Sequence, residues 1–175
     1  ANLTDYNRAF MNTGYFNRKY MARADYQGSG GDASHNFPRN YMDIRYADVL
    51  LMAAEVWLTD DPDKAAGYLN QVRTRALGEA AEKETITLDD IYHERRVEFG
   101  GEGLRKWDLL RRGLTYAESK INSSFTVPSG ILNPGDFTIR TFKANSWGMF
   151  PIPASEIRNM NTGVLEQKVP AYVGL

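Results

Sequence analysis

The sequence predicts a mainly α-helical fold, in which tetratricopeptide-like helical hairpins are wrapped by long irregular loops, with little β-structure. Three observations support this. Apolar residues between residues 43 and 113 recur at helical spacing. Glycine, proline and capping residues interrupt the pattern where helices should begin and end. The flanking segments, 1–42 and 114–175, lack a sustained period and are expected to be loop-rich and irregular, respectively.

The N-terminal segment, residues 1–42, is rich in Asn, Tyr, Arg and Gly. Residues 28–32 read Gly-Ser-Gly-Gly-Asp, which is typical of a loop. We expect a short ordered piece over residues 13–20 and then a long exposed loop.

The first predicted helix follows residue 43 and carries a wide apolar face. Leu50 and Trp57 widen this face, so the helix should be largely buried. The residues that define it lie three or four positions apart, as on one side of an α-helix; they are Ile44, Ala47, Leu51, Ala54 and Leu58.

A second helix is predicted immediately after the first. Asp61 is the expected N-cap and Pro62 the first helical residue. Because the link is short, the two helices should lie antiparallel. The apolar face of the second helix repeats the same spacing up to about Leu77; it consists of Ala65, Leu69, Val72 and Ala76.

A second hairpin is predicted from Thr87 to Gly113. Thr87 and Asp90 form a capping box at its start, and glycines at 100, 101 and 103 separate its two helices. The first helices of the two hairpins begin about 44 residues apart, a spacing similar to tetratricopeptide repeats with a lengthened loop. The expected faces are Ile91, Tyr92, Arg95 and Phe99 in one helix, and Leu104, Trp107, Leu110 and Leu114 in the other.

The C-terminal segment, 114–175, is predicted to be irregular, because the helical period is lost beyond Tyr116. Residues 133–136 read as a turn, and residues 150–153 should be extended because of their two prolines. One last helical turn is expected to start at residues 154–157.

Composition excludes several classes of function. The 21 basic and 22 acidic residues nearly cancel, so the charge indicates no nucleic-acid partner. The absence of cysteine excludes disulfides, thiolate catalysis and cysteine metal sites. The only histidines, His35 and His93, lie far apart, so no metal site is expected, and no motif indicates a cofactor. No apolar stretch is long enough to span a membrane.

Charged side chains crowd residues 94–112, where six basic residues are interleaved with four acidic ones. Paired carboxylates could serve glycoside hydrolysis, which needs a general acid with a raised pKa. Neighbouring arginines lower a carboxyl pKa instead. We therefore expect a structural ion-pair network and no catalytic residue. The predicted network residues are Glu55, Arg73, Glu94, Arg95, Glu98, Arg105 and Asp108.

Partners within this network follow from spacing and burial. Glu55 interrupts the most apolar helix, and a buried carboxylate needs a cation or a hydrogen-bond donor. Arg73 and Arg75 on the following helix are the candidates. The expected local pairs are Glu102 with Arg105 and with Lys106, and Asp108 with Arg112.

Aromatic residues give the remaining indication of function. Trp57 and Trp107 lie on apolar helical faces and are expected in the core. Tyr26 and Phe37 lie in the long loop, and Tyr41 flanks it, among polar residues suited either to sugar stacking or to anchoring the loop. The candidate glycan-binding residues are Tyr26, His35 and Phe37.

Four motifs together resemble the SusD/RagB family. Residues 45–55 and 69–76 resemble its helical signature. Residues 91–111, with their Glu-Arg-Arg-Val-Glu-Phe run, are similar to its second signature, and residues 151–157 with Gln167 are similar to its C-terminal motif. The four motifs occur in the same order as in the family and together span about 120 residues. Residues 168–172 depart from the family's usual ending.

This resemblance implies the C-terminal part of a surface-exposed outer-membrane lipoprotein of Bacteroidota-type bacteria, whose lipid anchor and remaining helices lie in an N-terminal remainder. It implies non-catalytic glycan capture for polysaccharide utilisation and nutrient uptake, with delivery to a SusC-like TonB-dependent transporter. In the family the charged motifs lie on scaffold helices. An alternative is a helical interaction module that mainly docks the transporter without contacting sugar itself.

Overall fold

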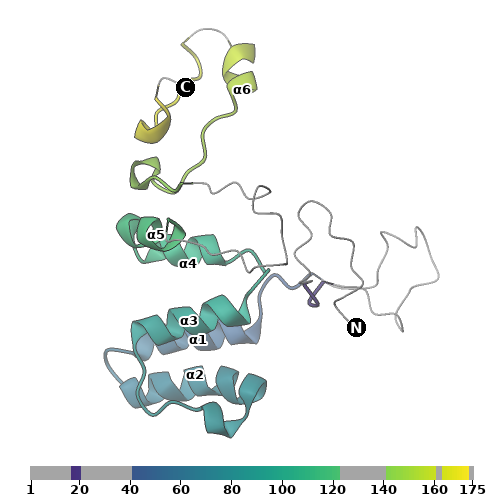
Figure 1. Cartoon of the computed structure of the whole chain (residues 1–175), viewed down its shortest axis with the longest axis vertical. Helices are drawn as coiled ribbons and strands as arrows, with labels where there is room; N and C mark the ends of the chain where they lie inside the picture. Colours follow the sequence, from purple (N-terminus) through teal and green to yellow (C-terminus); the bar gives the residue numbers. More distant parts are fainter. Residues whose placement is uncertain (1–16, 21–40, 123–140, 161–162, 174–175) are drawn as a thin grey trace, which may run out of the picture. The chain divides into compact units, whose positions relative to one another are not determined.

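The computed structural model describes residues 17–20, 41–122, 141–160 and 163–173 (Figure 1). These residues form helices and turns and contain no strand, which confirms the predicted mainly α-helical class. The chain divides into two compact units, which are described separately. The helical unit ends at residue 105, and the C-terminal unit begins, in its described part, at residue 106.

The first hairpin of the helical unit consists of α1 (Tyr46–Trp57) and α2 (Pro62–Leu77). The side chain of Asp61 accepts a hydrogen bond from the Lys64 N–H at 3.0 Å, so the predicted N-cap is confirmed. Pro62 occupies the start of α2, where its missing N–H leaves no hydrogen bond unmade. The link between the helices is too short for any arrangement other than antiparallel packing.

The core of the helical unit lies between α1, α2 and α3 (Leu88–Glu98), which lie side by side in Figure 1. Leu51, Leu69 and Ile91, one from each helix, are completely buried. Their burial removes apolar surface from water and supplies most of the driving force for packing. The remaining buried residues of this cluster are Leu50, Ala54, Val72 and Phe99.

Ile44 was predicted to lie on the buried face of the first helix, but it is 76% exposed and precedes the helix. The helix begins only after Arg45, whose backbone is extended at φ −118° and ψ 148°. The guanidinium of Arg45 bonds to Glu98, the last residue of α3, and to Glu102 beyond it, which holds Arg45 outside the helix. Ala76, at the other end of the hairpin, is likewise exposed.

The predicted capping box at the start of α3 is confirmed. The Thr87 hydroxyl accepts a hydrogen bond from the Asp90 N–H at 3.2 Å, and the Asp90 carboxylate accepts one from the Thr87 N–H at 2.8 Å. The four residues predicted to share one face of this helix are all buried; they are Ile91, Tyr92, Arg95 and Phe99.

Replacing Thr87 by alanine should destabilise the helical unit by about 1 kcal/mol, because the Asp90 N–H loses its capping acceptor. Urea unfolding followed by circular dichroism measures this change. Thr85→Ala, at an exposed position two residues earlier, is the matched control and should leave the midpoint nearly unchanged. Equal effects of the two substitutions would contradict the capping role.

Stability should also depend on pH through Asp90. Hydrogen bonds from Lys83 and Thr87 lower the pKa of Asp90 from its ordinary value of 3.8 to about 2. Because the folded pKa lies below the unfolded one, the stabilisation is present above about pH 3.8 and is lost as pH falls towards about 2. Across this window, Asp90→Asn should lose less unfolding free energy than the wild type. Urea unfolding at several pH values measures this difference. If the unfolding free energies of the wild type and Asp90→Asn had the same pH dependence, this assignment would be contradicted.

The fourth predicted helix is shorter than expected, and a fifth follows it. α4 spans Arg105–Arg111, and α5 spans Leu114–Ile121 after a break at Gly113, which has φ +100°. The period therefore does not end at Tyr116. Trp107 was expected in the core but is 61% exposed, because α4 buries Asp108 and Leu109 instead.

The rest of the C-terminal unit consists of short elements. α6 (Ala154–Asn159) confirms the predicted last helical turn. Two 3₁₀ turns, Ala144–Ser146 and Pro170–Tyr172, flank it, and a third, Glu79–Ala81, follows α2 in the helical unit. The predicted turn at residues 133–136 lies outside the described residues. None of the helices described has the length and apolarity needed to cross a bilayer.

Candidate functional site

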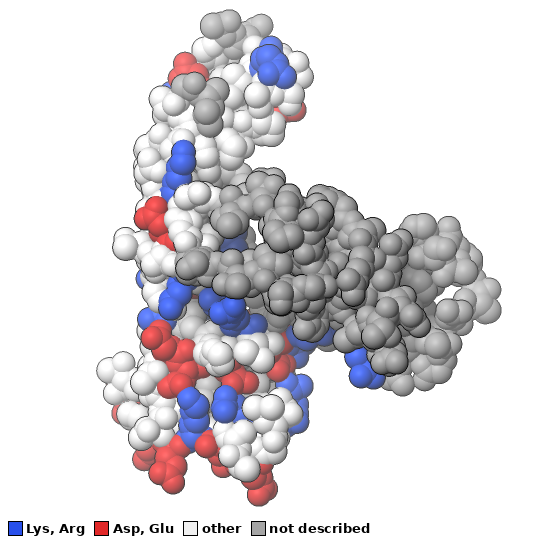
Figure 2. Space-filling model, viewed as in Figure 1, with Lys and Arg blue, Asp and Glu red and all other residues white. Residues whose placement is uncertain are grey.

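Two carboxylates near the end of α3, Glu98 and Glu102, are held by cations from distant parts of the sequence. Arg45 donates to Glu98 at 2.6 Å and to both oxygens of Glu102 at 2.9 and 3.0 Å. Lys19 donates to Glu102 at 2.6 Å, and Arg75 donates to Glu98 at 2.7 Å. Basic and acidic side chains are accordingly interleaved over this unit in Figure 2.

The electrostatics of this cluster oppose acid catalysis. Burial would raise the pKa of Glu102, but hydrogen bonds from Lys19 and Arg45 outweigh it and hold the pKa below its ordinary value. Burial would lower the pKa of Arg45, but its hydrogen bonds to Glu102 and Glu98 raise it. Both partners therefore remain charged, and Glu102 cannot deliver a proton near neutral pH.

The glycines after α3 allow the chain to bring Glu102 back to this cluster. Gly101 has φ +83°, a conformation that residues with a Cβ rarely adopt. A Cβ on Gly101 would also lie 2.1 Å from the side-chain nitrogen of Asn17. The tight turn at this position therefore requires glycine.

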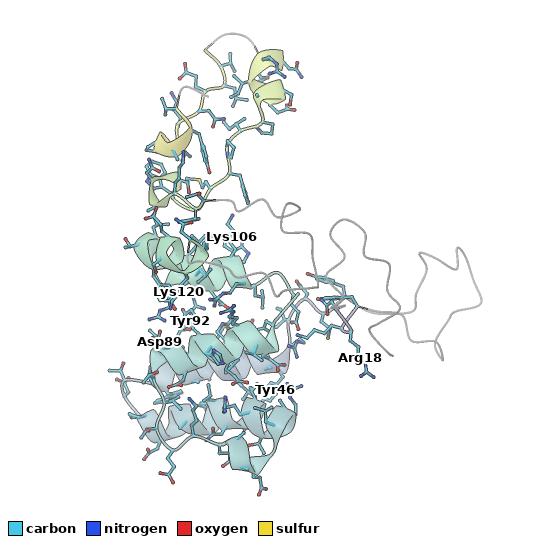
Figure 3. The ribbon with its side chains drawn as sticks, viewed as in Figure 1. Arg18, Tyr46, Asp89, Tyr92, Lys106 and Lys120 are labelled. Carbon is cyan, nitrogen blue, oxygen red and sulfur yellow. The ribbon has the colours of Figure 1, made fainter. Side chains whose placement is uncertain are left out.

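A second part of the ion-pair network joins the three helices of the helical unit. Arg73 donates to Glu94 at 2.7 Å, and Arg95 donates to Asp48 at 2.6 Å. Glu94 and Arg95 are almost completely buried, so each charge needs its partner. Tyr92 on α3, labelled in Figure 3, donates its hydroxyl to Glu55 at 3.1 Å.

Several predicted ion-pair partners differ from those in the structure. Glu102 bonds to Lys19 and Arg45, rather than only to helical neighbours as expected. The candidate cations for Glu55 bond to other carboxylates, Arg73 to Glu94 and Arg75 to Glu98. Asp108 is 2% exposed, and its Oδ1 lies 3.9 Å from Nη1 of Arg111. Arg105 is the first residue of α4.

The candidate sugar-contacting residues Tyr26, His35 and Phe37 lie outside the described residues. Tyr20 and Tyr41, at the two ends of that segment, are described and stack with ring centroids 6.3 Å apart and an interplanar angle of 18°. Tyr41 is 71% exposed, so one ring of this pair is largely open to solvent.

The C-terminal unit contains a pocket of about 360 Å³ that sequence reasoning missed. One wall comes from α4, and the opposite wall comes from residues 141–150. Most of its lining is apolar, including Leu110, Ile121, Phe142, Met149, Phe150 and Tyr172.

Several hydrogen bonds fix the second wall of this pocket. The side-chain amide of Asn122 bonds to both the N–H and the carbonyl of Phe142, at 2.8 and 2.9 Å. The Tyr172 hydroxyl donates to the Met149 carbonyl at 3.1 Å. Residues 141–150 are therefore tied to the end of α5 and to the C-terminal 3₁₀ turn.

The backbone of Gly148 lies close to the side chain of Leu110 on α4. It has φ +71°, and a Cβ at this position would lie 2.6 Å from a methyl carbon of Leu110. Only glycine allows the backbone to pass so close to α4. The neighbouring Trp147 is also left-handed, at φ 53°, and its ring is half exposed.

Within the part of the chain that the structure describes, the pocket is lined by two charged residues, Lys106 and Lys143. The ammonium of Lys106 lies 3.9 Å from the ring centroid of Phe150 and 5.4 Å from that of Trp107. Figure 3 shows Lys106 on α4. Phe150 is 77% exposed, so its ring is available for a ligand as well as for the lysine.

The model of the SusD family matches residues 2–172, nearly the whole chain. The chain belongs to the SusD family. No solved structure matches it significantly.

Curated relatives of this SusD-family chain include two SusD-like proteins from Formosa agariphila and one from Bacteroides ovatus. The Formosa proteins are 31% identical over 159 residues, covering 83% of this chain, and 37% identical over 105 residues, covering 56%. The Bacteroides protein is 42% identical over 79 residues, covering 43% of this chain. The matched regions span 29%, 20% and 14% of these relatives, so the chain spans a minor part of their length.

The charged stretch at residues 94–102 lies within the ion-pair network. Glu94, Arg95, Glu98 and Glu102 bond across the helices rather than facing an open cleft. No group of three or more potential metal ligands occurs among the residues that the structure describes. The pocket of the C-terminal unit is a separate feature, whose lining comes from four stretches of sequence without a common period.

Proposed function

We propose that this chain is part of a protein that captures glycans at the bacterial outer-membrane surface without cleaving them, and passes them to a SusC-like TonB-dependent transporter. The SusD-family match over residues 2–172 carries this proposal. The lipid anchor and further helices are assigned to an N-terminal remainder, consistent with the much greater length of the relatives.

The geometry of the carboxylates supports a binding role rather than hydrolysis. A glycosidase needs a carboxylic acid and a carboxylate facing a sugar across roughly 5 to 9.5 Å. Glu98 and Glu102 instead share the guanidinium of Arg45, and Glu94 bonds to Arg73. These arginines neutralise the carboxylates and fix them as part of the scaffold.

We assign sugar contacts to Tyr26, His35 and Phe37, since aromatic rings among polar loop residues suit sugar stacking. The exposed Tyr41 ring, at the end of the same segment, supports this assignment. Phe37→Ala should weaken glycan binding, whereas Tyr68→Ala in the half-buried part of α2 should change stability rather than affinity for the folded protein.

Isothermal titration of the full-length protein against a panel of plant, algal and host polysaccharides tests the proposal. The expected result is saturable binding of at least one glycan, with no new reducing ends after prolonged incubation. Cleavage of any glycan would disprove the non-catalytic role, and no binding across the panel would disprove glycan capture.

A second candidate function, a module that mainly docks the transporter, is favoured by one surface of α1. Tyr46, Val49, Met52 and Val56 lie on one side of this helix and are 41–74% exposed. Their spacing places an apolar stripe opposite the buried face. Tyr46→Ser with Val56→Gln should then reduce co-purification with the transporter while glycan binding persists. Val164→Gln, 64% exposed in the C-terminal unit, is the control.

A further inference from the structure

The pocket of the C-terminal unit combines an apolar floor with an exposed aromatic ring. Phe150 is 77% exposed and Met149 49% exposed, and both line the pocket. A pyranose ring presents C–H groups on its faces, which pack well against an aromatic ring or a thioether. The pocket volume of about 360 Å³ falls in the range of small-ligand sites.

Among the described residues, the charge that lines this pocket has one sign. Lys106 and Lys143 line it, and no described Asp or Glu does. Glu118 on α5 lies outside the lining and accepts a hydrogen bond from the Ala144 N–H at 3.3 Å. Within the described residues, Lys106 contacts aromatic rings and forms no ion pair. A partly buried ammonium without a carboxylate partner is complementary to an anionic ligand.

One wall of the pocket is also held in place by contacts within the C-terminal unit. Asn122 and Tyr172 hold residues 141–150 by hydrogen bonds, and Gly148 packs its backbone against Leu110. A wall that is already ordered loses little conformational entropy on binding.

We propose that this pocket binds an acidic sugar residue of the captured glycan, with the sugar face on Phe150 and the anionic group at Lys106. This inference rests on the proposed glycan-binding function and deepens it. Uronates and sulfated sugars share the required chemistry, namely a pyranose ring that carries a negative charge.

The test titrates the full-length protein with neutral, uronate-containing and sulfated polysaccharides at low ionic strength. An acidic glycan should bind more tightly than every neutral one, and added salt should weaken its binding. Carboxyl reduction should abolish binding of a uronate, whereas desulfation should abolish binding of a sulfated glycan, which distinguishes the two sources of charge.

Variants then locate the binding to the pocket. Lys106→Gln should weaken binding of the acidic glycan by about tenfold or more, the expected effect of losing a charged hydrogen bond. Lys106→Arg should retain most of the affinity. Lys64→Gln is the matched control, because Lys64 also lies over an aromatic ring, 3.4 Å from the centroid of Trp57, but outside the pocket. Phe150→Ala should weaken binding, whereas Tyr46→Ala, an exposed aromatic on α1, should not.

Negative results of these binding experiments distinguish the acidic-sugar proposal from the proposal of glycan capture. Binding confined to neutral glycans would overturn the acidic-sugar inference and leave glycan capture standing. Acidic-glycan binding that is unchanged in both Lys106→Gln and Phe150→Ala would also overturn it. Absence of binding to every glycan would overturn the proposed function itself. Circular dichroism of each variant shows that the fold persists.

Discussion

Truncating Leu51 to alanine should lower the free energy of unfolding by roughly 3 kcal/mol, as expected for a fully buried leucine. Leu51 is completely buried and belongs to the cluster that joins α1 to α2 and α3. The substitution removes apolar contacts and leaves a cavity that rigid helices fill only in part. Urea unfolding followed by circular dichroism measures the loss.

Val56→Ala is the matched control for this experiment. Val56 lies on the same helix but is 74% exposed, so its truncation should change the unfolding free energy by less than about 0.5 kcal/mol. A loss below about 1 kcal/mol for Leu51→Ala would contradict the packing of the three helices around this residue.

Replacing Glu102 by alanine should lower the unfolding free energy by roughly 2 to 3 kcal/mol. The expected loss lies below the usual cost of about 3 to 5 kcal/mol for breaking a buried ion pair. Arg45 keeps Glu98 as a partner, and the side chain of Lys19 is 32% exposed and can be solvated. Thermal or urea unfolding of the full-length protein measures the change.

Glu166→Ala is the corresponding surface control. Glu166 pairs with Lys168, and their side chains are 56% and 80% exposed, so the loss of Glu166 should change the unfolding free energy far less than the loss of Glu102. A double variant, Glu102→Ala with Lys19→Ala, should be less destabilised than the two single effects added together. Strict additivity would show that the two residues do not interact in solution.

Local chemistry made much of the fold predictable. The capping box of Thr87 and Asp90 and the N-cap of Asp61 each depend on residues three positions apart, so their pattern is visible in sequence. The buried residues of α3 followed from helical period in the same way. The prediction that Trp107 lies in the core was wrong, because the helical period alone does not say which side of an amphipathic helix meets the core.

Contacts between distant residues were the part that sequence could not supply. Lys19 lies 83 residues from Glu102, and no local rule pairs them. The pocket likewise depends on Lys106, Phe150 and Tyr172, which come from separate segments. Its local signal in the sequence was the run Trp-Gly-Met-Phe at residues 147–150, which does not indicate which residues it contacts.

The turn at residues 18–20 is joined to the end of α3 by charge. The ammonium of Lys19 donates both to the Glu102 carboxylate and to the Glu98 carbonyl. Mobile ions weaken an attachment of this kind, whereas apolar packing in the nearby core is far less sensitive to them. Rising ionic strength should therefore loosen the attachment of this turn, while the helices to which it is joined keep their arrangement.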